Sequence, residues 1–390
     1  ANIPELASGM IPVTYDEGEK SWVKADINEA WYDYEAQMWA NAVTVTENTR
    51  DTYTNAEAGT TISMNDINTM WVWIPRYEYQ YTDLGNNYAG GSQKTPGEIK
   101  INFIPTLQVT PSDNSVYKIP EGFTFGDEEL SGFWVGKFET TGSMSASCTD
   151  ENCTTADLSI KPNLASVTDQ TLSSLFYGIR SMQNATNASK YGFDVIGSST
   201  QDIHMTKNTE WGIVAYLSQS KYGKYGNPAY SGANKEIYQN KSASYVTGMS
   251  SGMPGQVNGS TQVVPYDTPN TGYGASTTGT IYGVYDMSGG ARENVMGNYN
   301  NMAGSSGFTS FPDGKYYDLY TSASASVGYK AGDATYETVG WYMDLSVSWG
   351  SLGMWITRGG SNTSISDAGV FQYSGASGNT GSGTRCSLKP

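Results

Sequence analysis

Charged residues are scarce in this 390-residue chain, at 15% of the total. Acidic residues still outnumber basic ones, 38 to 22, which gives a formal net charge of −16. Negative charge repels the phosphate backbone of nucleic acids and the surface of anionic bilayers. The composition therefore argues against a nucleic-acid-binding protein and against docking on a lipid surface. It fits an exported protein, or a protein that takes up cations.

Long apolar runs are also missing. No run approaches the roughly 20 apolar residues that a membrane-spanning helix needs, so we expect no membrane insertion. Hydrophobic residues make up only 38% of the chain, but aromatic residues reach 13%. So many large rings exclude an intrinsically disordered chain and can fill a core.

Cysteine and histidine are nearly absent, at three residues and one residue. Four residues separate Cys148 from Cys153, a gap that can close a small disulfide-bonded hairpin; free thiols and a metal site are the alternatives. A zinc site lacks partners, because Cys386 and His204 are distant in the sequence. We therefore expect a disulfide between Cys148 and Cys153. His204 lies in a polar run, so we expect it at the surface or capping a helix.

Glycine is abundant, with 45 residues, and short aromatic runs alternate with Asn, Ser and Thr. This pattern is typical of many short strands joined by long loops. A first helix is expected over residues 169–187 and a second over 208–221, where Trp211 marks the buried face. The apolar stripe of the first helix consists of Leu172, Leu175, Phe176, Ile179 and Met182. Residues 222–280 show no periodicity and are expected to form long ordered loops.

Two aromatic segments, residues 71–79 and 133–139, resemble each other. We expect them to be two paired core strands; an internal duplication is the alternative. Residues 1–65 hold Trp22, Trp31 and Trp39 between polar stretches. They predict an N-terminal arm or small subdomain, followed by a main domain with loop insertions over residues 66–390.

Four segments, taken in order, resemble the formylglycine-generating-enzyme (sulfatase-modifying-factor) family. They are Phe133-Trp-Val-Gly-Lys-Phe-Glu-Thr-Thr141, Asn208-Thr-Glu-Trp-Gly-Ile-Val-Ala215, Ile281-Tyr-Gly-Val-Tyr-Asp-Met-Ser-Gly-Gly-Ala-Arg-Glu293, and Arg358-Gly-Gly-Ser361 with Arg385-Cys386. The resemblance covers roughly residues 70–390. It implies a variant of the C-type lectin fold, which is an α+β fold of mixed short strands, two main helices and long irregular loops.

The chemistry of the family is not carried over. The resemblance implies two cysteines between the Arg-Gly-Gly-Ser segment and the terminal Arg-Cys, which hold copper and activate oxygen. Residues 361–384 contain no cysteine, and Cys386 matches a family cysteine outside that reactive pair. A copper(I) site of that kind cannot form without soft thiolate ligands. We therefore expect no copper and no enzyme activity; a divergent enzyme of the family is the least favoured alternative.

The third motif implies a calcium site, because the family wraps a calcium ion with this segment. The residues that match its ligands are Asp286, Gly289, Ala291 and Glu293. The residue types are suitable, since two carboxylates flank a Gly-Gly turn and calcium accepts 6–8 oxygens at about 2.3–2.6 Å. Solvated carboxylates beside a glycine turn are the alternative. Arg292, where the family has Trp, would add a competing positive charge.

The segment from residue 361 to 383 combines small polar residues with two aromatic ones. Ser, Gly, Asn and Tyr are the residues of adaptable binding surfaces. The same final stretch forms the variable binding face in lectin-fold proteins diversified by retroelements; an ordinary loop and last hairpin is the alternative. The residues expected to bind a ligand are Asn362, Thr363, Phe371, Tyr373 and Asn379.

These observations predict a non-catalytic extracellular protein, similar to exported or phage proteins of gut Firmicutes. It would be carried by a bacterial cell-surface appendage or a phage virion and act as an adhesin. Its C-terminal face would bind a cell-surface glycan or protein receptor. The alternative is a structural subunit that self-assembles into a filament, pilus or phage tail, in which residues 1–65 contact a neighbouring copy.

Overall fold

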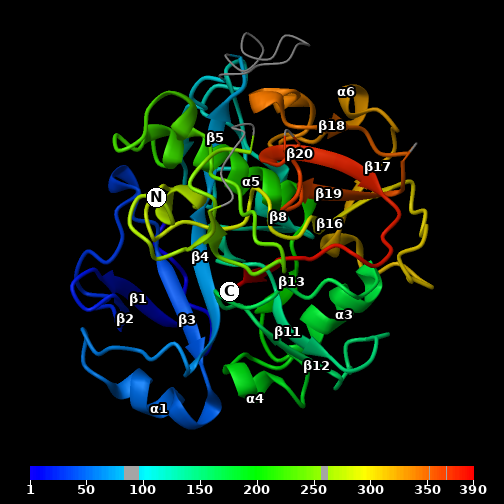
Figure 1. Cartoon of the computed structure of the whole chain (residues 1–390). Helices are drawn as coiled ribbons and strands as arrows, with labels where there is room; N and C mark the ends of the chain where they lie inside the picture. The colour runs from blue at the N-terminus through cyan, green and yellow to red at the C-terminus, as the bar shows by residue number, and fades with distance from the viewer. Residues whose placement is uncertain (83–95, 256–261, 351, 366) are drawn as a thin grey trace.

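A computed structural model describes residues 1–82, 96–255, 262–350, 352–365 and 367–390. Within these residues the chain has a mixed α+β fold with one sheet of seven strands and one of five. Figure 1 shows the N-terminal strands of the larger sheet on the left of the molecule and the smaller sheet on the right. The α+β class expected from the sequence is confirmed.

The seven-stranded sheet is antiparallel throughout and has the order β13-β21-β10-β4-β3-β1-β2. These strands are β13 (Asp202–Met205), β21 (Cys386–Lys389), β10 (Gly132–Gly136), β4 (Ile67–Pro75), β3 (Asn41–Val45), β1 (Ile11–Asp16) and β2 (Ser21–Lys24). Phe133 pairs with Ile74 and Gly136 with Trp71, so the two similar aromatic segments are paired strands, as expected. All nine residues of β4 are buried, because β4 lies in the middle of the sheet.

The first 65 residues contribute three strands to this same sheet. Their tryptophans also contact the long loop region: Trp22 Nε1 donates to the Tyr266 hydroxyl at 3.0 Å, and Trp39 Nε1 donates to the Tyr222 carbonyl at 2.8 Å. Trp22 and Trp39 belong to the hydrophobic cluster that continues through the rest of the chain. The segment expected as an arm or subdomain is therefore packed as part of the main sheet.

The five-stranded sheet has the order β17-β16-β19-β20-β18. Its strands are β17 (Asp318–Tyr320), β16 (Glu293–Tyr299), β19 (Trp355–Gly359), β20 (Gly369–Ala376) and β18 (Ser346–Val347). The edge strands β17 and β18 run parallel to their neighbours, whereas β16, β19 and β20 pair antiparallel. The calcium-loop motif leads into β16, and the expected ligand-binding segment contains β20.

Smaller sheets and helices complete the described structure. The short strands are β5 (Tyr77–Gln80), β6 (Ile101–Phe103), β7 (Tyr117–Lys118), β8 (Thr124–Phe125), β9 (Glu128–Glu129), β11 (Thr141–Met144), β12 (Ala156–Ser159), β14 (Met249–Ser250) and β15 (Val264–Pro265). The α-helices are α1 (Glu47–Asn55), α3 (Leu172–Ser181), α4 (Ala188–Tyr191), α5 (Asn208–Ser218) and α6 (Ala325–Gly328). The 3-10 helices are η1 (Tyr34–Ala36), η2 (Glu121–Phe123), η3 (Lys224–Gly226), η4 (Gly232–Lys235), η5 (Tyr273–Ala275), η6 (Gly314–Tyr316), η7 (Tyr336–Thr338) and η8 (Trp341–Met343).

The two helices expected from the sequence, α3 and α5, are both present. The Thr171 side chain accepts a hydrogen bond from Ser174 N and caps α3, and the whole predicted apolar stripe of α3 is buried. Every residue of α5 is buried. Residues 222–280 contain only short elements in their described part, as expected for long ordered loops.

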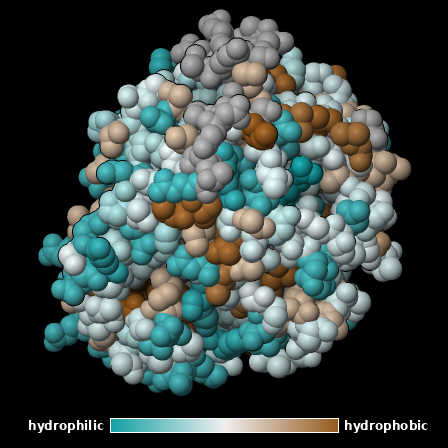
Figure 2. Space-filling view, in the orientation of Figure 1, coloured by the Kyte–Doolittle hydropathy of each residue, from teal (hydrophilic) through white to brown (hydrophobic). Residues whose placement is uncertain are grey.

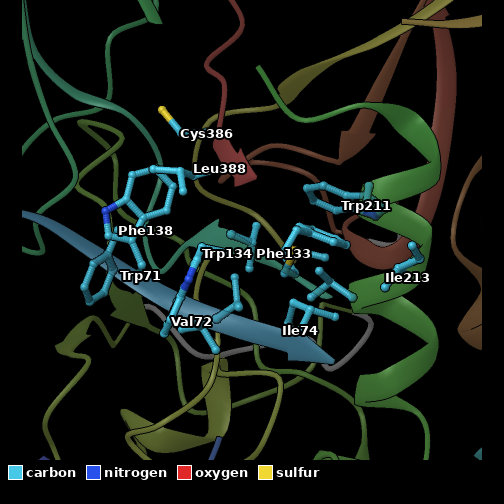
Figure 3. Packing of buried hydrophobic residues seen from close by; sticks show 14 of the residues in the cluster. Trp71, Val72, Ile74, Phe133, Trp134, Phe138, Trp211, Ile213, Cys386 and Leu388 are labelled. Atoms are coloured by element: carbon cyan, nitrogen blue, oxygen red, sulfur yellow. The ribbon is translucent and has the colours of Figure 1, made fainter. Parts of the chain in front are cut away.

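The core lies between the seven-stranded sheet and α5. Figure 3 shows aromatic and aliphatic side chains of β4 and β10 facing Trp211 and Ile213 of α5. The Tyr77 hydroxyl donates to the Ile213 carbonyl at 2.7 Å, and Trp211 Nε1 donates to the Val370 carbonyl of β20 at 2.9 Å. Helix α5 therefore links the two sheets. Among the described helices, none has the length and apolar character needed to span a bilayer.

Candidate functional site

The segment that resembles a calcium-binding loop, Ile281 to Glu293, runs through the interior, and only Tyr282 and Arg292 keep appreciable exposed surface. Its turn depends on glycine. Gly289 has φ +77°, and an added Cβ would lie 2.3 Å from the Asn240 carbonyl oxygen. Gly290 has φ +70°, and its Cβ would lie 2.7 Å from a carboxylate oxygen of Glu139. The loop is thus packed closely against two other segments, through the backbone of Asn240 and the side chain of Glu139.

Asp286 ties this loop to residues 240–248. Its Oδ1 accepts from Asn240 Nδ2 at 2.7 Å, and its Oδ2 accepts from Gly248 N at 2.9 Å. The Thr247 hydroxyl donates to the same carboxylate. Both oxygens of Asp286 are therefore already hydrogen-bonded to protein donors.

Glu293 faces a buried arginine from the last strand. Its Oε1 lies 2.7 Å from Arg385 Nη2, and both side chains are 1% exposed. Arg385 also donates to the carbonyls of Gly136 at 2.9 Å and Tyr285 at 2.7 Å. Arg292, expected to compete with a cation, is exposed instead, so Arg385 supplies the buried positive charge beside the loop.

A third carboxylate, Glu139, completes the cluster. One of its oxygens accepts from the Ser166 hydroxyl and, at 3.4 Å, from Ala291 N. The other oxygen, and both oxygens of Glu293, are buried and accept no well-oriented hydrogen bond among the described residues. Glu293 is thus ion-paired at short distance without a well-aligned hydrogen bond.

Burial raises the pKa of all three carboxyl groups. The neighbouring Asp286 and Glu293 raise the pKa of Glu139 further, to well above its ordinary value. The pKa of Glu293 rises to about 7, since desolvation outweighs the opposing effect of Arg385. The cluster holds three carboxyl groups against one guanidinium, so bound protons or a cation must supply the missing positive charge.

Calcium fits this cluster only in part. Glu139 Oε1 and Glu293 Oε2 have no partner among the described residues and are oxygens of the kind that calcium prefers, whereas Glu293 Oε1 is ion-paired with Arg385. Asp286, in contrast, would have to release protein donors before it could bind an ion. Over the described ranges, no three or more His, Cys, Asp or Glu side chains are grouped as a metal site. The oxygens that favour a cation therefore lie at Glu293 and Glu139, not at all four expected ligands.

The cysteines occupy two different settings. Cys148 and Cys153 form a disulfide whose Cα atoms are 5.4 Å apart. Cys386 is a buried free thiol, and burial raises its pKa to about 12. A thiol with so high a pKa carries almost no thiolate at neutral pH, and the thiolate is the reactive form.

The residues expected to bind a ligand do not lie on one face. Phe371 and Tyr373 of β20 are buried, at 0% and 2% exposure, and Asn362 donates through its amide to the Ser242 carbonyl at 2.8 Å. Residues 369–373 of β20 are all buried, and Asn362 is only 7% exposed, so these three side chains offer little surface to a ligand. Thr363 and Asn379 are exposed, but they lie beyond opposite ends of β20.

Exposed apolar side chains in this region come from other positions. Met343 is 40% exposed, Leu352 60% and Ile365 62%. Trp341 and Trp349, which precede Met343 and Leu352 closely in the sequence, are fully buried. Figure 2 shows hydrophobic atoms gathered at the upper right, where Figure 1 places β18 and β20. We call Met343, Leu352 and Ile365 the exposed apolar set.

A buried charged network was missed from the sequence. His204, expected at the surface or as a cap, is 1% exposed. Its Nδ1 lies 3.2 Å from Asp202 Oδ1, and its Nε2 lies 2.8 Å from Glu210 Oε1. Arg180 Nη1 donates to the same Asp202 oxygen at 3.0 Å. The sequence does hold a signal for the contact between Asp202 and His204. Residues two apart on a strand point to the same side, so these two side chains must lie on one face of β13.

No protein-family model matches the chain, and no curated protein matches it either.

Proposed function

We propose that this chain is a non-catalytic extracellular protein that binds a receptor or ligand through its C-terminal face. The observation that carries the proposal is the exposed apolar set beside fully buried tryptophans. Apolar side chains held out by a rigid framework stay in contact with water unless a partner covers them. A stable sheet that displays such residues is suited to recognition.

The proposed architecture is the C-type-lectin-like fold of the formylglycine-generating-enzyme type. The four motifs in order support it. The last of these motifs supplies β21, which pairs with β10, the strand of the first motif. The segment Asn208–Ala215 falls within α5, which packs beneath the sheet formed by the last two motifs.

The absence of catalysis is proposed from chemistry. Residues 361–384 hold no cysteine, and the buried Cys386 thiol is protonated at neutral pH. A buried, protonated thiol is suited to packing in the core and not to redox chemistry. The extracellular location is supported by the disulfide between Cys148 and Cys153, since such bonds persist in oxidising compartments.

The test is to replace the exposed apolar set by aspartate in one variant (M343D, L352D, I365D). The matched control is Val195→Asp, a site of 39% exposure outside this face. We expect the triple variant to lose binding to receptor-bearing cells or a glycan array, while its melting temperature stays within about 2 °C, because surface substitutions cost little. Equal binding by the triple variant and the wild type would contradict the proposal.

Self-assembly is the second candidate, and the same exposed apolar set favours it. Light scattering on the purified chain separates the two. A monomer of about the 42.1 kDa chain mass supports receptor binding. A polymer that the triple variant dissolves and the Val195→Asp control does not supports a filament, pilus or tail subunit.

Calcium is proposed as a stabilising ion at Glu293 and Glu139, where two buried oxygens, Glu139 Oε1 and Glu293 Oε2, have no partner among the described residues. A ligand that binds only the folded state raises its stability, so millimolar calcium is expected to raise the melting temperature and a chelator to lower it. Glu293→Gln is expected to remove most of this response. An unchanged melting temperature in the wild type at millimolar calcium would rule the ion out.

A further inference from the structure

A polar pocket of about 500 Å³ opens where α5 begins, beside β17 and the β8–β9 turn. Three lysines line it: Lys207, Lys315 and Lys330. We call it the lysine pocket. Its lining contains none of the exposed apolar set, so binding in this pocket is independent of the proposed function.

Lys207 is the unusual member. Only 5% of this residue is exposed, yet its ammonium forms no hydrogen bond and no ion pair with any described residue. It lies over the ring of Phe125, whose centroid is 5.5 Å from Nζ. The Asp318 and Glu210 carboxylates attract this ammonium from beyond ion-pair distance, so its N–H donors remain free for a ligand.

The other two lysines extend the positive charge. Lys315 Nζ lies 5.7 Å from the centroid of the same Phe125 ring and forms no ion pair among the described residues. Lys330 Nζ lies 3.6 Å from Glu121 Oε2, and the Glu121 side chain is 52% exposed. A water-exposed pair at that distance is weak, so Lys330 remains available to a ligand.

The remaining acid in the pocket is already engaged. Asp318 Oδ2 accepts from Thr209 N at 2.7 Å, and its Oδ1 accepts from the Thr209 hydroxyl at 3.0 Å. The Asp318 carboxylate therefore binds the first turn of α5, and it attracts Lys207 and Lys330 from beyond contact distance without pairing with either. Three lysines face two acids here, in a chain with a formal net charge of −16.

The pocket also offers an aromatic wall. Tyr317 lines it, and the Tyr317 hydroxyl donates to Asn301 Oδ1 at 2.7 Å, which fixes the ring. A volume of about 500 Å³ lies within the range of small-molecule pockets, roughly 300–1,000 Å³. A ligand that suits both features has an oxyanion for the lysines and a ring for the tyrosine.

We propose that the lysine pocket binds an acidic saccharide, with a carboxylate or sulfate group held by Lys207 and Lys315. Lys330 adds to the attraction once its weak pair with Glu121 opens. Ammonium groups bind such oxyanions through charge-assisted hydrogen bonds, which are stronger than neutral ones. The ligand would accept hydrogen bonds from the Lys207 ammonium, which Asp318 and Glu210 attract only from beyond contact distance.

Calorimetric titration of the whole chain tests this with matched sugars: glucuronate against glucose, and galactose 6-sulfate against galactose. We expect an acidic sugar to bind, its neutral partner to fail, and the affinity to fall as salt is raised. Lys207→Met or Lys315→Met should weaken binding about tenfold or more, the loss of one charge-assisted hydrogen bond. The control is Lys235→Met, whose ammonium also lies on a ring (Tyr225, 4.3 Å) but outside the pocket.

A Glu121→Gln variant is expected to strengthen binding, whereas the lysine variants weaken it. The substitution is at an exposed side chain and leaves the buried residues unchanged. It releases Lys330 and should tighten binding of the acidic sugar. Inorganic sulfate and inorganic phosphate are titrated as two further ligands. If they bind as tightly as the acidic sugars, the saccharide is wrong; if no acidic sugar binds at millimolar concentration, or if Lys235→Met weakens binding as much as Lys315→Met, the site is wrong.

Discussion

His204 is held between two buried carboxylates, and its ring stacks on Phe125 with centroids 4.7 Å apart. Burial alone would lower its pKa, but Glu210 and Asp202 raise it to about 9. Arg180 also faces Asp202 and partly offsets this attraction. At neutral pH the core therefore contains an imidazolium that links β13 to α5.

This pKa predicts a dependence of stability on pH. The folded pKa of His204, about 9, exceeds the ordinary unfolded value of about 6.5. Its contribution, roughly 3 kcal/mol, is therefore full below pH 6.5 and is lost as the pH rises towards 9. Urea unfolding from pH 6 to 9 measures it, and His204→Gln should remove this part of the slope. Identical pH profiles for the two proteins would contradict the assignment.

At the scale of elements, the turn at residues 288–290 is fixed by glycine and by close backbone approach. Gly289 has a positive φ, and an added Cβ would meet the Asn240 carbonyl. Gly59 offers a matched control, since its φ is +86° and no atom lies within 4 Å of its added Cβ. Comparing alanine substitutions at Gly59 and Gly289 therefore separates the cost of backbone strain from the cost of steric crowding.

Gly59→Ala is expected to cost about 1–2 kcal/mol, because a residue with a Cβ is strained in the left-handed conformation. Gly289→Ala should cost about 2 kcal/mol more, because backbone atoms must also move apart. Chemical denaturation of both variants gives the two free energies of unfolding. Equal losses would mean that the loop relaxes freely and that the contact with Asn240 is unimportant.

Elements with a strong local pattern were predictable. The apolar stripe predicted α3, and the two aromatic runs predicted the pair β4 and β10, since periodicity and ring content act within one element. The burial of Phe371 and Tyr373 was not predictable, because composition does not say that both faces of this part of β20 are covered. The partner of Arg385 was not predictable either, because Glu293 is remote in sequence and only the folded sheet brings the two side chains together.

At the scale of the molecule, residues 1–65 contribute to the large sheet. They supply β1, β2 and β3, and β3 covers the edge of β4. Deletion of residues 1–65 would expose the backbone donors and acceptors of a strand whose nine residues are all buried. Open apolar strand edges pair with other chains.

We therefore expect the chain without residues 1–65 to aggregate or remain unfolded. Size-exclusion chromatography and near-ultraviolet circular dichroism of the refolded deletion variant check this. A soluble, cooperatively unfolding product of residues 66–390 would contradict this expectation and would support the division at residue 65 expected from the sequence.

The position of β21 bears on how fast this protein can fold. Trp134 of β10 pairs with Leu388 of β21, and β21 in turn pairs with Ile203 of β13. β13 thus joins the large sheet only through β21. β21 is far along the chain from both strands that it pairs with, β10 and β13. Bringing such distant segments together must precede any gain from their contacts, so folding rates fall as contact order rises. Until β21 docks, β10 keeps an open edge, and the interval before docking is when this chain is most exposed to misassembly and most dependent on chaperones.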